Sequence, residues 1–383
     1  MELKKIIIGV NLTVLFVILV AGFYPFEFKP ANKVYRLKNN GVIINHSGMI
    51  YEANDESRAP ILSKMSVNSE LSIEILLKPL SPSSYNISSI LSFYDDNDFE
   101  IFMLAQWKSN LILRRRIVQL KNKYTYHEVD VPDTIFPGKK LFIALTMTQK
   151  GTSVYIDGIP KSFFPKYLIT PDNNKFKNSR IMIGNNPSIK YPLHGEIYGL
   201  AIYNCAFSAT DISIHFMRWK KNDFKYLSNE SGIIELYPMN EKSGSIIGNI
   251  ITKNNNMYIP KNLFAIKKTF LGMTWHHFWR NKNFYKDLII NILGFIPFGF
   301  FLLALFVSYY KRNSINFFII TILIGTSLSL FIELIQAYMP ARSSDIIDLI
   351  SNTFGTILGV ILFHIIYTHY LPKMKKTGLI RFI

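Results

Sequence analysis

Polar side chains recur at helical spacing within the apolar C-terminal third of the chain. Residues three or four positions apart lie on one face of a helix, so each group would form a single stripe. The stripes consist of Asp287 and Asn291, then Ser329, Glu333 and Gln336, and finally Asp345, Asp348 and Asn352. Grouped carboxylates could hold a cation or a polar ligand, or act as a general acid and base.

The stripes lie on segments that are apolar and long enough to cross a bilayer. The expected transmembrane helices that carry them are residues 288–309, 315–338 and 346–367. A further helix is expected within residues 1–24, where Ile6 to Phe23 carry no charge. A cleaved signal peptide is the alternative for this first segment, but no small-x-small cleavage motif follows it.

The short flanks of the apolar helices predict the orientation. Lysine and arginine residues at 4–5, 311–312 and 373–381 fall on one side of the membrane. Positive charges in short loops stay in the cytoplasm, so both termini and the tail at residues 368–383 are expected there. The long block after the first helix is then extracytoplasmic. The basic residues just before 288 do not overturn this, because long translocated domains are largely exempt from the charge rule.

In this orientation the three polar stripes lie at one level, near the outer ends of their helices. Arg342, in the short loop before the last helix, lies above them. A carboxylate at this depth is costly unless it is paired, protonated or hydrated. Four acids near one arginine are poorly balanced for a purely structural network. We therefore expect a functional polar pocket, with a network that locks helix packing as the alternative.

Small and helix-bending residues accompany the stripes. Gly355 and Gly359 form a small-xxx-small pair that is typical of close helix packing. Pro297 would kink its helix, and Gly294 and Gly299 lie on either side of it. We expect all five residues to serve helix packing.

The same region, over about residues 285–365, together with the first helix resembles the VanZ-like family of bacterial membrane proteins, and the VanZ-like domain is expected at about 285–367. The resemblance is carried by NILGFIPFGF, SLSLFIELIQ and ARSSDIIDLISNTFGTILG. The family pattern includes Asn291, Pro297, Gly299, Ser329, Glu333, Gln336, Arg342, Asp345, Asp348, Asn352, Gly355 and Gly359. The family's namesake is associated with teicoplanin resistance. The resemblance therefore implies a bacterial cell membrane protein linked to glycopeptide antibiotic tolerance.

Residues 25–262 contain short β-like runs separated by glycine, proline, asparagine and aspartate. The runs include Leu71–Pro79, Ser89–Tyr94, Phe99–Ala105, Leu111–Ile117, Leu141–Thr148, Ser153–Ile156, Arg180–Ile183 and Glu196–Tyr203. Asp157-Gly158 is typical of a hairpin turn. The expected fold is thus a membrane α-helical protein with four transmembrane helices and an all-β jelly-roll sandwich inserted between helices 1 and 2.

The β block also resembles laminin-G-like, concanavalin A-like jelly rolls, over about residues 40–220. The segments that carry this resemblance are LSIEILLKP, LFIALTMTQKGTSVYIDGIP, IMIGNNP and LHGEIYGLAIYNCAFSATDI. GIIELYPMNEKSG, at 232–244, resembles a further strand pair of the same domain. This fold hosts lectins, hydrolases and adhesion modules, so the resemblance implies carbohydrate binding without naming a ligand.

Site chemistry in the β block is sparse. Asp96, Asp98 and Glu100 have the spacing of carboxylates on one face of a strand, but an acidic turn explains them as well. Asp95, Asp96 and Asp98 are candidate calcium ligands, and a solvated turn is again the alternative. Beyond this calcium site we expect no cofactor. The single cysteine, Cys205, rules out an intrachain disulfide.

The net charge of +17 indicates anionic partners. Nothing resembles a nucleic-acid module, so phospholipid headgroups and wall polymers fit better. Residues 263–287 combine lysines with tryptophans, which favours a segment lying on the membrane surface. The expected partners are the lipid bilayer and a glycan, a lipid-linked glycan or an anionic wall polymer.

Three functions follow from these features. The first is an envelope protein that binds a glycan or lipid-linked glycan through the jelly roll and the polar pocket. The second is a membrane enzyme acting on a lipid-linked substrate, with Glu333 or Asp348 as general acid or base and Arg342 binding an anionic group. The third is a structural or adhesion protein without a small ligand.

Overall fold

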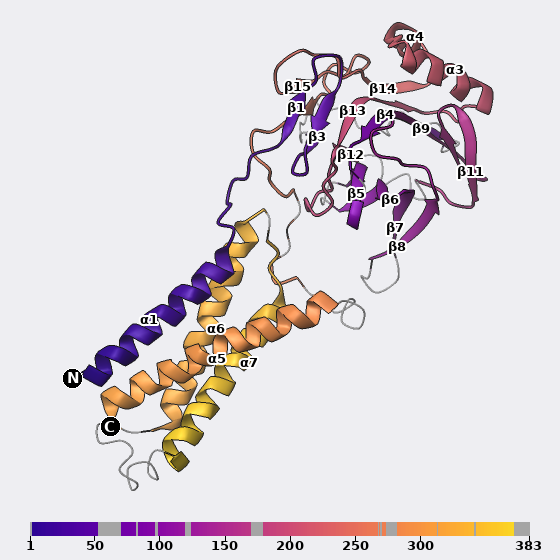
Figure 1. Cartoon of the computed structure of the whole chain (residues 1–383). Coiled ribbons are helices and arrows are strands. Elements are labelled where there is room, and N and C mark those ends of the chain that lie inside the picture. Colours follow the sequence, from indigo (N-terminus) through magenta and orange to yellow (C-terminus); the bar gives the residue numbers. More distant parts are fainter. Residues whose placement is uncertain are drawn as a thin grey trace. The chain divides into compact units, whose positions relative to one another are not determined.

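The computed structural model contains two compact units, which are described separately. One is a β unit at residues 30–267, and the other is a helical bundle formed by residues 1–29 and 268–383 (Figure 1). The structure describes residues 2–52, 70–81, 83–95, 99–118, 124–169, 179–266, 268, 270–272, 282–311, 313–340 and 342–370. Asp96, Asp98, most of the predicted surface segment and residues 371–383 of the tail lie outside them.

The β unit consists of two antiparallel sheets whose inner faces share one apolar core. The first sheet runs β1 (Val34–Arg36), β2 (Val42–Ile44), β13 (Gly195–Tyr203), β4 (Leu71–Pro79), β9 (Leu141–Thr148), β10 (Gly151–Ile156) and β11 (Ile159–Pro165), with β14 (Ile233–Tyr237) also paired to β13. The second sheet runs β15 (Ile246–Ile247), β16 (Met257–Tyr258), β3 (Ile50–Glu52), β12 (Arg180–Ile183), β5 (Ser83–Tyr94), β6 (Glu100–Lys108), β7 (Asn110–Val118) and β8 (Tyr124–Val131). The predicted sandwich is confirmed, including the extra strand near residue 232.

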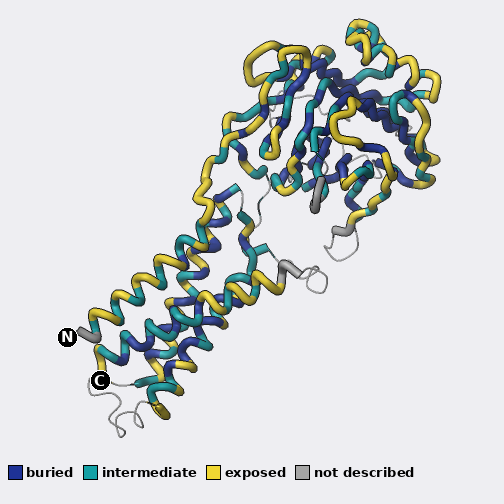
Figure 2. The backbone as a smooth tube through the Cα atoms, in the orientation of Figure 1, coloured by how far each residue is buried: buried dark blue, intermediate teal, exposed yellow. Residues whose placement is uncertain are grey.

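Strand β4 is buried on both faces (Figure 2). Ile73 and Ile75 point into the core between the sheets, whereas Leu76 packs against helix α3 (Ala209–Lys220). This helix and the short α4 (Phe224–Ser228) cover the outer face of the first sheet. The burial of both faces explains why β4 has a nearly continuous apolar run instead of strict alternation.

The predicted hairpin and turn are confirmed in the first sheet. Strands β9 and β10 pair with Thr148 opposite Gly151. Asp157 and Gly158 then connect β10 to β11 with φ angles of 52° and 81°. Two consecutive positive φ angles match the twist of a two-residue hairpin turn, which explains the aspartate–glycine pair.

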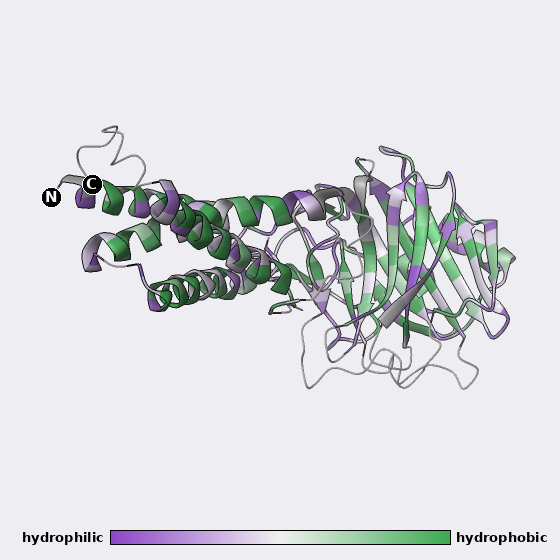
Figure 3. Cartoon of the chain, turned by 90° about the horizontal axis from the view of Figure 1, so that it is seen from below, coloured by the Kyte–Doolittle hydropathy of each residue, from purple (hydrophilic) through white to green (hydrophobic). Residues whose placement is uncertain are grey.

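In the described part of the chain, four helices are long and apolar enough to cross a membrane. They are α1 (Glu2–Phe23), α5 (Lys282–Tyr310), α6 (Ile315–Tyr338) and α7 (Ile346–Ile365), and α7 continues into the π-helical turn η3 (Ile366–Tyr370). Hydrophobic residues cover most of their length (Figure 3). Helix α5 begins six residues before the position expected from apolarity alone, because its first turn is polar.

Glycines hold α5 and α7 in close contact. A side chain at Gly359 would clash with the main-chain oxygen of Ile296, and one at Gly299 would clash with that of Thr356. Gly355 meets the backbone of α5 in the same way. Gly294 differs from these three, because a Cβ atom there would meet nothing within 4 Å. Close backbone approach therefore explains three of the predicted packing glycines but not Gly294.

Candidate functional site

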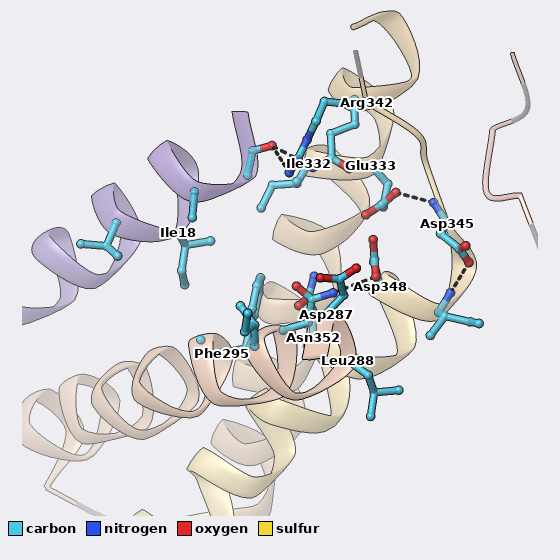
Figure 4. A pocket seen from close by; sticks show the side chains of 18 of the residues that line it. Ile18, Asp287, Leu288, Phe295, Ile332, Glu333, Arg342, Asp345, Asp348 and Asn352 are labelled. Atoms are coloured by element: carbon cyan, nitrogen blue, oxygen red, sulfur yellow. Dashed lines mark hydrogen bonds between the residues drawn. The ribbon is translucent and has the colours of Figure 1, made fainter. Parts of the chain in front are cut away.

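The polar stripes converge on a cavity of about 880 Å³ within the helical bundle (Figure 4). It lies where α1 and α6 end and where α5 and α7 begin. Its polar lining contains Asp287, Asn291, Glu333, Gln336, Arg342, Asp345, Asp348 and Asn352. Every predicted pocket residue except Ser329 is therefore a lining residue, and Ser329 lies directly behind as a partner of Asn352.

Glu333 joins the end of α6 to the start of α7. Its side chain is 1% exposed, and its Oε2 accepts a hydrogen bond of 2.9 Å from the Asp345 backbone N–H. Asp345 is the N-cap of α7, and its Oδ1 accepts from the Ile347 backbone N–H at 3.0 Å. Both carboxylates are thus placed at a helix N-terminus, where backbone N–H groups and the helix dipole favour negative charge.

The centre of the cavity is formed by amides and carboxylates from three helices. The Asn291 side-chain amide donates to Asp348 Oδ1 at 2.8 Å, which joins α5 to α7. The Asn352 amide donates to Ser329 Oγ at 2.9 Å, which joins α7 to α6. Asp287, in the first turns of α5, faces the same space and remains exposed.

The end of α1 is held by residues that also line the cavity. The main-chain oxygen of Gly22 accepts hydrogen bonds from Gln336 Nε2 at 2.8 Å and from Arg342 Nη2 at 3.2 Å. The last carbonyls of a helix lack partners within the helix, so these side chains satisfy one of them. Sequence spacing could not reveal this contact, because a backbone oxygen leaves no pattern of residue types.

Lys268 and Gly272, which precede α5 in the sequence, form hydrogen bonds with the end of α6 and with the loop between α6 and α7. Lys268 Nζ donates to the main-chain oxygens of Gln336 and Met339 at the C-terminal end of α6 and to that of Arg342 in the following loop. This placement suits a cation, because the C-terminal end of a helix carries partial negative charge. Gly272 N–H donates to the Ser344 main-chain oxygen at 2.9 Å and extends the attachment.

The other wall of the cavity is apolar. Val17 and Ile290 line it from α1 and α5 and are 58% and 53% exposed, so the cavity reaches the apolar outer surface of the bundle. Ile18, Phe295 and Ile332 are buried together and form its floor. Gly294 also lines this wall, which explains the open space beside it. A cavity with one charged end and one apolar wall suits an amphiphile.

The β unit contains a buried polar cluster that the sequence analysis did not identify. Glu74 on β4 is fully buried, and its Oε1 lies 2.6 Å from His215 Nδ1 on α3. Its Oε2 accepts from Trp219 Nε1 at 2.8 Å and from the Tyr203 hydroxyl at 3.2 Å. Burial alone would lower the pKa of His215, but the hydrogen bond and charge of Glu74 outweigh it and raise that pKa.

The acidic turn near residue 95 is only partly described. The Asp95 carboxylate lies 2.5 Å from Arg116 and accepts from the Phe99 backbone N–H at 2.9 Å. Burial raises the pKa of Glu100 to about 6, against the lowering effect of Arg114. The described residues contain no group of three or more histidine, cysteine or acidic side chains arranged for a metal ion.

The outer face of the second sheet carries exposed aromatic side chains beside charged ones. The strand register places Trp107, Arg114 and Tyr126 on the same face, opposite the core residues of β7. The Arg114 guanidinium lies 5.6 Å from the Tyr126 ring and bonds Glu128 at 2.7 Å. Exposed rings beside arginine and glutamate provide both stacking surface and hydrogen-bonding groups.

Three solved structures with 12–18% identity resemble part of the chain. A Bacteroides ovatus protein assigned to carbohydrate binding is 12% identical, with a TM-score of 0.39, over 61% of this chain and 63% of that one. The CBM40 of a Ruminococcus gnavus sialidase, bound to α2,3-sialyllactose, is 18% identical, with a TM-score of 0.37, over 47% of this chain and 98% of that one. Domain 4 of a Geobacillus stearothermophilus extracellular arabinanase, in complex with arabinotriose, is 16% identical, with a TM-score of 0.34, over 49% of this chain and 85% of that one. The chain spans less than two thirds of the first structure.

Family models match two separate regions. Residues 219–367 match the VanZ/LLP1 family, and residues 52–213 match the concanavalin A-like lectin/glucanases superfamily. No curated protein matches the sequence. With its four apolar helices, the chain is a multi-pass membrane protein that joins a VanZ-like region to a concanavalin A-like domain.

Proposed function

We propose that this protein binds an amphiphilic glycan of the bacterial cell envelope, with the lipid end in the bundle cavity and the sugar on the β unit. In this proposal both termini are cytoplasmic and the β unit is extracytoplasmic. The observation that carries it is the cavity, which combines an apolar wall on α1 and α5 with carboxylates, amides and a guanidinium at one end.

The cavity favours binding over a purely structural network. A network that only locks helices would be expected to close around its charged groups, because burying unpaired charge is costly. Here the charged groups surround a space of about 880 Å³, which is within the usual range of roughly 300–1,000 Å³ for ligand pockets.

The proposed binding of the lipid end in the cavity is tested by native mass spectrometry of the full chain, released in detergent from its own membrane. Glu333→Gln keeps an acceptor for the Asp345 N–H but removes the charge. Glu27→Gln, which removes an exposed carboxylate outside the cavity, is the control. We expect a co-purifying amphiphile in wild type and in Glu27→Gln and its loss in Glu333→Gln. Identical bound species in all three forms would reject the cavity as the binding site.

The proposed binding of the sugar on the β unit is tested by measuring how the full chain, held in lipid nanodiscs, binds to an array of envelope glycans. The proposed sugar surface is the outer face of the second sheet, where Tyr126 is 50% exposed. Tyr126→Ala should weaken glycan capture, because it removes a stacking surface. Tyr35→Ala, at a ring on β1 that is 56% exposed, should not. Equal capture by both variants would remove this face from the proposal.

Glycopeptide tolerance would follow if the bound glycan were a cell-wall precursor. We propose that deleting the gene lowers the teicoplanin concentration that inhibits growth. Restoring the wild-type gene should raise it again, whereas Glu333→Gln should not. Equal rescue by both would separate tolerance from the cavity.

A further inference from the structure

The cavity carries an excess of negative charge. Among the residues that the structure describes, Asp287, Glu333, Asp345 and Asp348 line it with one guanidinium, that of Arg342. Lys268 is close by, and its ammonium group donates to the main-chain oxygens of Gln336 in α6 and of Arg342 in the following loop. Like charges crowded in a partly buried site repel one another, so the arrangement favours a ligand that brings positive charge.

An unused acceptor points to the same chemistry. Asn352 is 5% exposed and lines the cavity beside Asp287 and Asp348 (Figure 4). Its NH₂ group donates to Ser329, while its Oδ1 is buried without a hydrogen-bond partner among the described residues. A buried acceptor without a donor is costly, so a ligand with N–H groups would satisfy it.

Arg342 provides the complementary charge at the other side of the polar end. Among the described residues its guanidinium makes one hydrogen bond, to Gly22 O, and no carboxylate lies within 4 Å of it. A guanidinium has five N–H donors and binds phosphate or carboxylate groups through two of them at once. The polar end of the cavity therefore offers a site for an anionic group as well as a site for a cation.

We infer that the amphiphile in the cavity carries a primary ammonium group next to an anionic group. The ammonium contacts Asp287, Asp348 and Asn352 Oδ1, the anionic group contacts Arg342, and the hydrocarbon lies along Val17 and Ile290. This inference rests on the proposed function and narrows its ligand class. A headgroup with only negative charge would face the carboxylates without compensation.

Two sources could supply this chemistry, a phospholipid headgroup or a free amino sugar on a phosphate-linked lipid. The experiment titrates the delipidated full chain, by native mass spectrometry, with two probe pairs. One pair is phosphatidylethanolamine and its N-acetyl derivative. The other is polyprenyl-phosphate-linked glucosamine and its N-acetyl derivative. N-acetylation removes the positive charge and two N–H donors and leaves the phosphate and hydrocarbon unchanged.

We expect the amine form of at least one pair to bind about tenfold or more tightly than its acetylated form. The pair that shows this preference identifies the source. Asp348→Asn should abolish the preference, since it removes a charge but keeps an acceptor for Asn291. Glu27→Gln should retain it.

A variant that blocks the cavity distinguishes failure of the ammonium inference from failure of amphiphile binding itself. Gly294→Phe fills open space on the cavity wall, so it should prevent binding of any amphiphile there. Equal affinity for amine and acetylated probes, lost in Gly294→Phe, would overturn the ammonium inference and leave amphiphile binding intact. If Gly294→Phe binds all four probes as wild type does, both the ammonium inference and the proposal of amphiphile binding in the cavity are overturned.

Discussion

The two units each contain a cluster of charged side chains, but the clusters differ in how far they are enclosed. In the β unit, Glu74 is surrounded by donors from His215, Trp219 and Tyr203, with no exposed side chain among them. In the described part of the bundle, four carboxylates and one guanidinium line an open cavity. An enclosed cluster whose carboxylate is fully hydrogen-bonded stabilises a fold, whereas carboxylates beside free space are suited to a ligand.

The largest effect is expected at the enclosed cluster. Glu74→Ala leaves the buried donors of His215, Trp219 and Tyr203 without an acceptor, which should cost about 3–5 kcal/mol of unfolding free energy in the β unit. Denaturant unfolding followed by tryptophan fluorescence measures this. Glu128→Gln, at a half-exposed ion pair, is the control and should change stability little. A Glu74→Ala protein as stable as this control would refute the structural assignment.

The next effect compares two glycines of the bundle. Gly359→Ala introduces a clash with the backbone of α5 and should cost about 1–3 kcal/mol. Gly294→Ala points into open space and should leave thermal stability almost unchanged. Thermal unfolding of both variants in the same detergent is the measurement. Equal losses would mean that the two positions pack alike.

A smaller effect is expected from pH at the β-unit cluster. The pKa of His215 is raised above its ordinary value of 6.5, because Glu74 and Glu230 outweigh burial. Its contribution to stability is therefore complete below about pH 6.5 and is lost as the pH rises through the raised pKa. Unfolding curves from pH 5 to 9 should show this decline in wild type but not in His215→Gln. The same slope in the variant would assign it to another group.

The smallest effect on stability is expected at the cavity. Glu333→Gln keeps a hydrogen-bond acceptor and relieves crowding among carboxylates, so the unfolding free energy should change by less than about 1 kcal/mol. This variant is nevertheless expected to lose the bound amphiphile. A large loss of stability without any change in bound species would make the bundle cluster structural, like that around Glu74.

The polar residues that line the bundle cavity could be predicted from the sequence because a helix repeats every 3.6 residues. Asp348 and Asn352 share a face wherever the helix forms, and an apolar environment makes such residues conspicuous. The contact of Arg342 with Gly22 could not be predicted, since its acceptor belongs to the backbone. Gly294 resembled the packing glycines because residue type does not reveal what lies opposite.

The β-unit cluster had no comparable signal. Glu74 and His215 are 141 positions apart, and one lies on a strand while the other lies on a helix. Glu74 alternates with core residues of β4, so it resembled a solvent-facing side chain. Helix α3 could have been recognised by its capping box, in which Ser208 and Asp211 exchange hydrogen bonds.

The hydrogen bonds that hold Gly22 make the cavity depend on parts of the chain that are synthesised far apart in time. Helix α1 emerges first, and residues 24–281 follow before α5 begins. At about 5–20 residues per second, translation from α1 to Asn352 takes on the order of tens of seconds. During that interval Gln336 and Arg342 have not been synthesised, so the Gly22 main-chain oxygen of α1 lacks these two hydrogen bonds. The cavity can therefore form only after the chain has been synthesised as far as Asn352, and a product that ends before α7 lacks it.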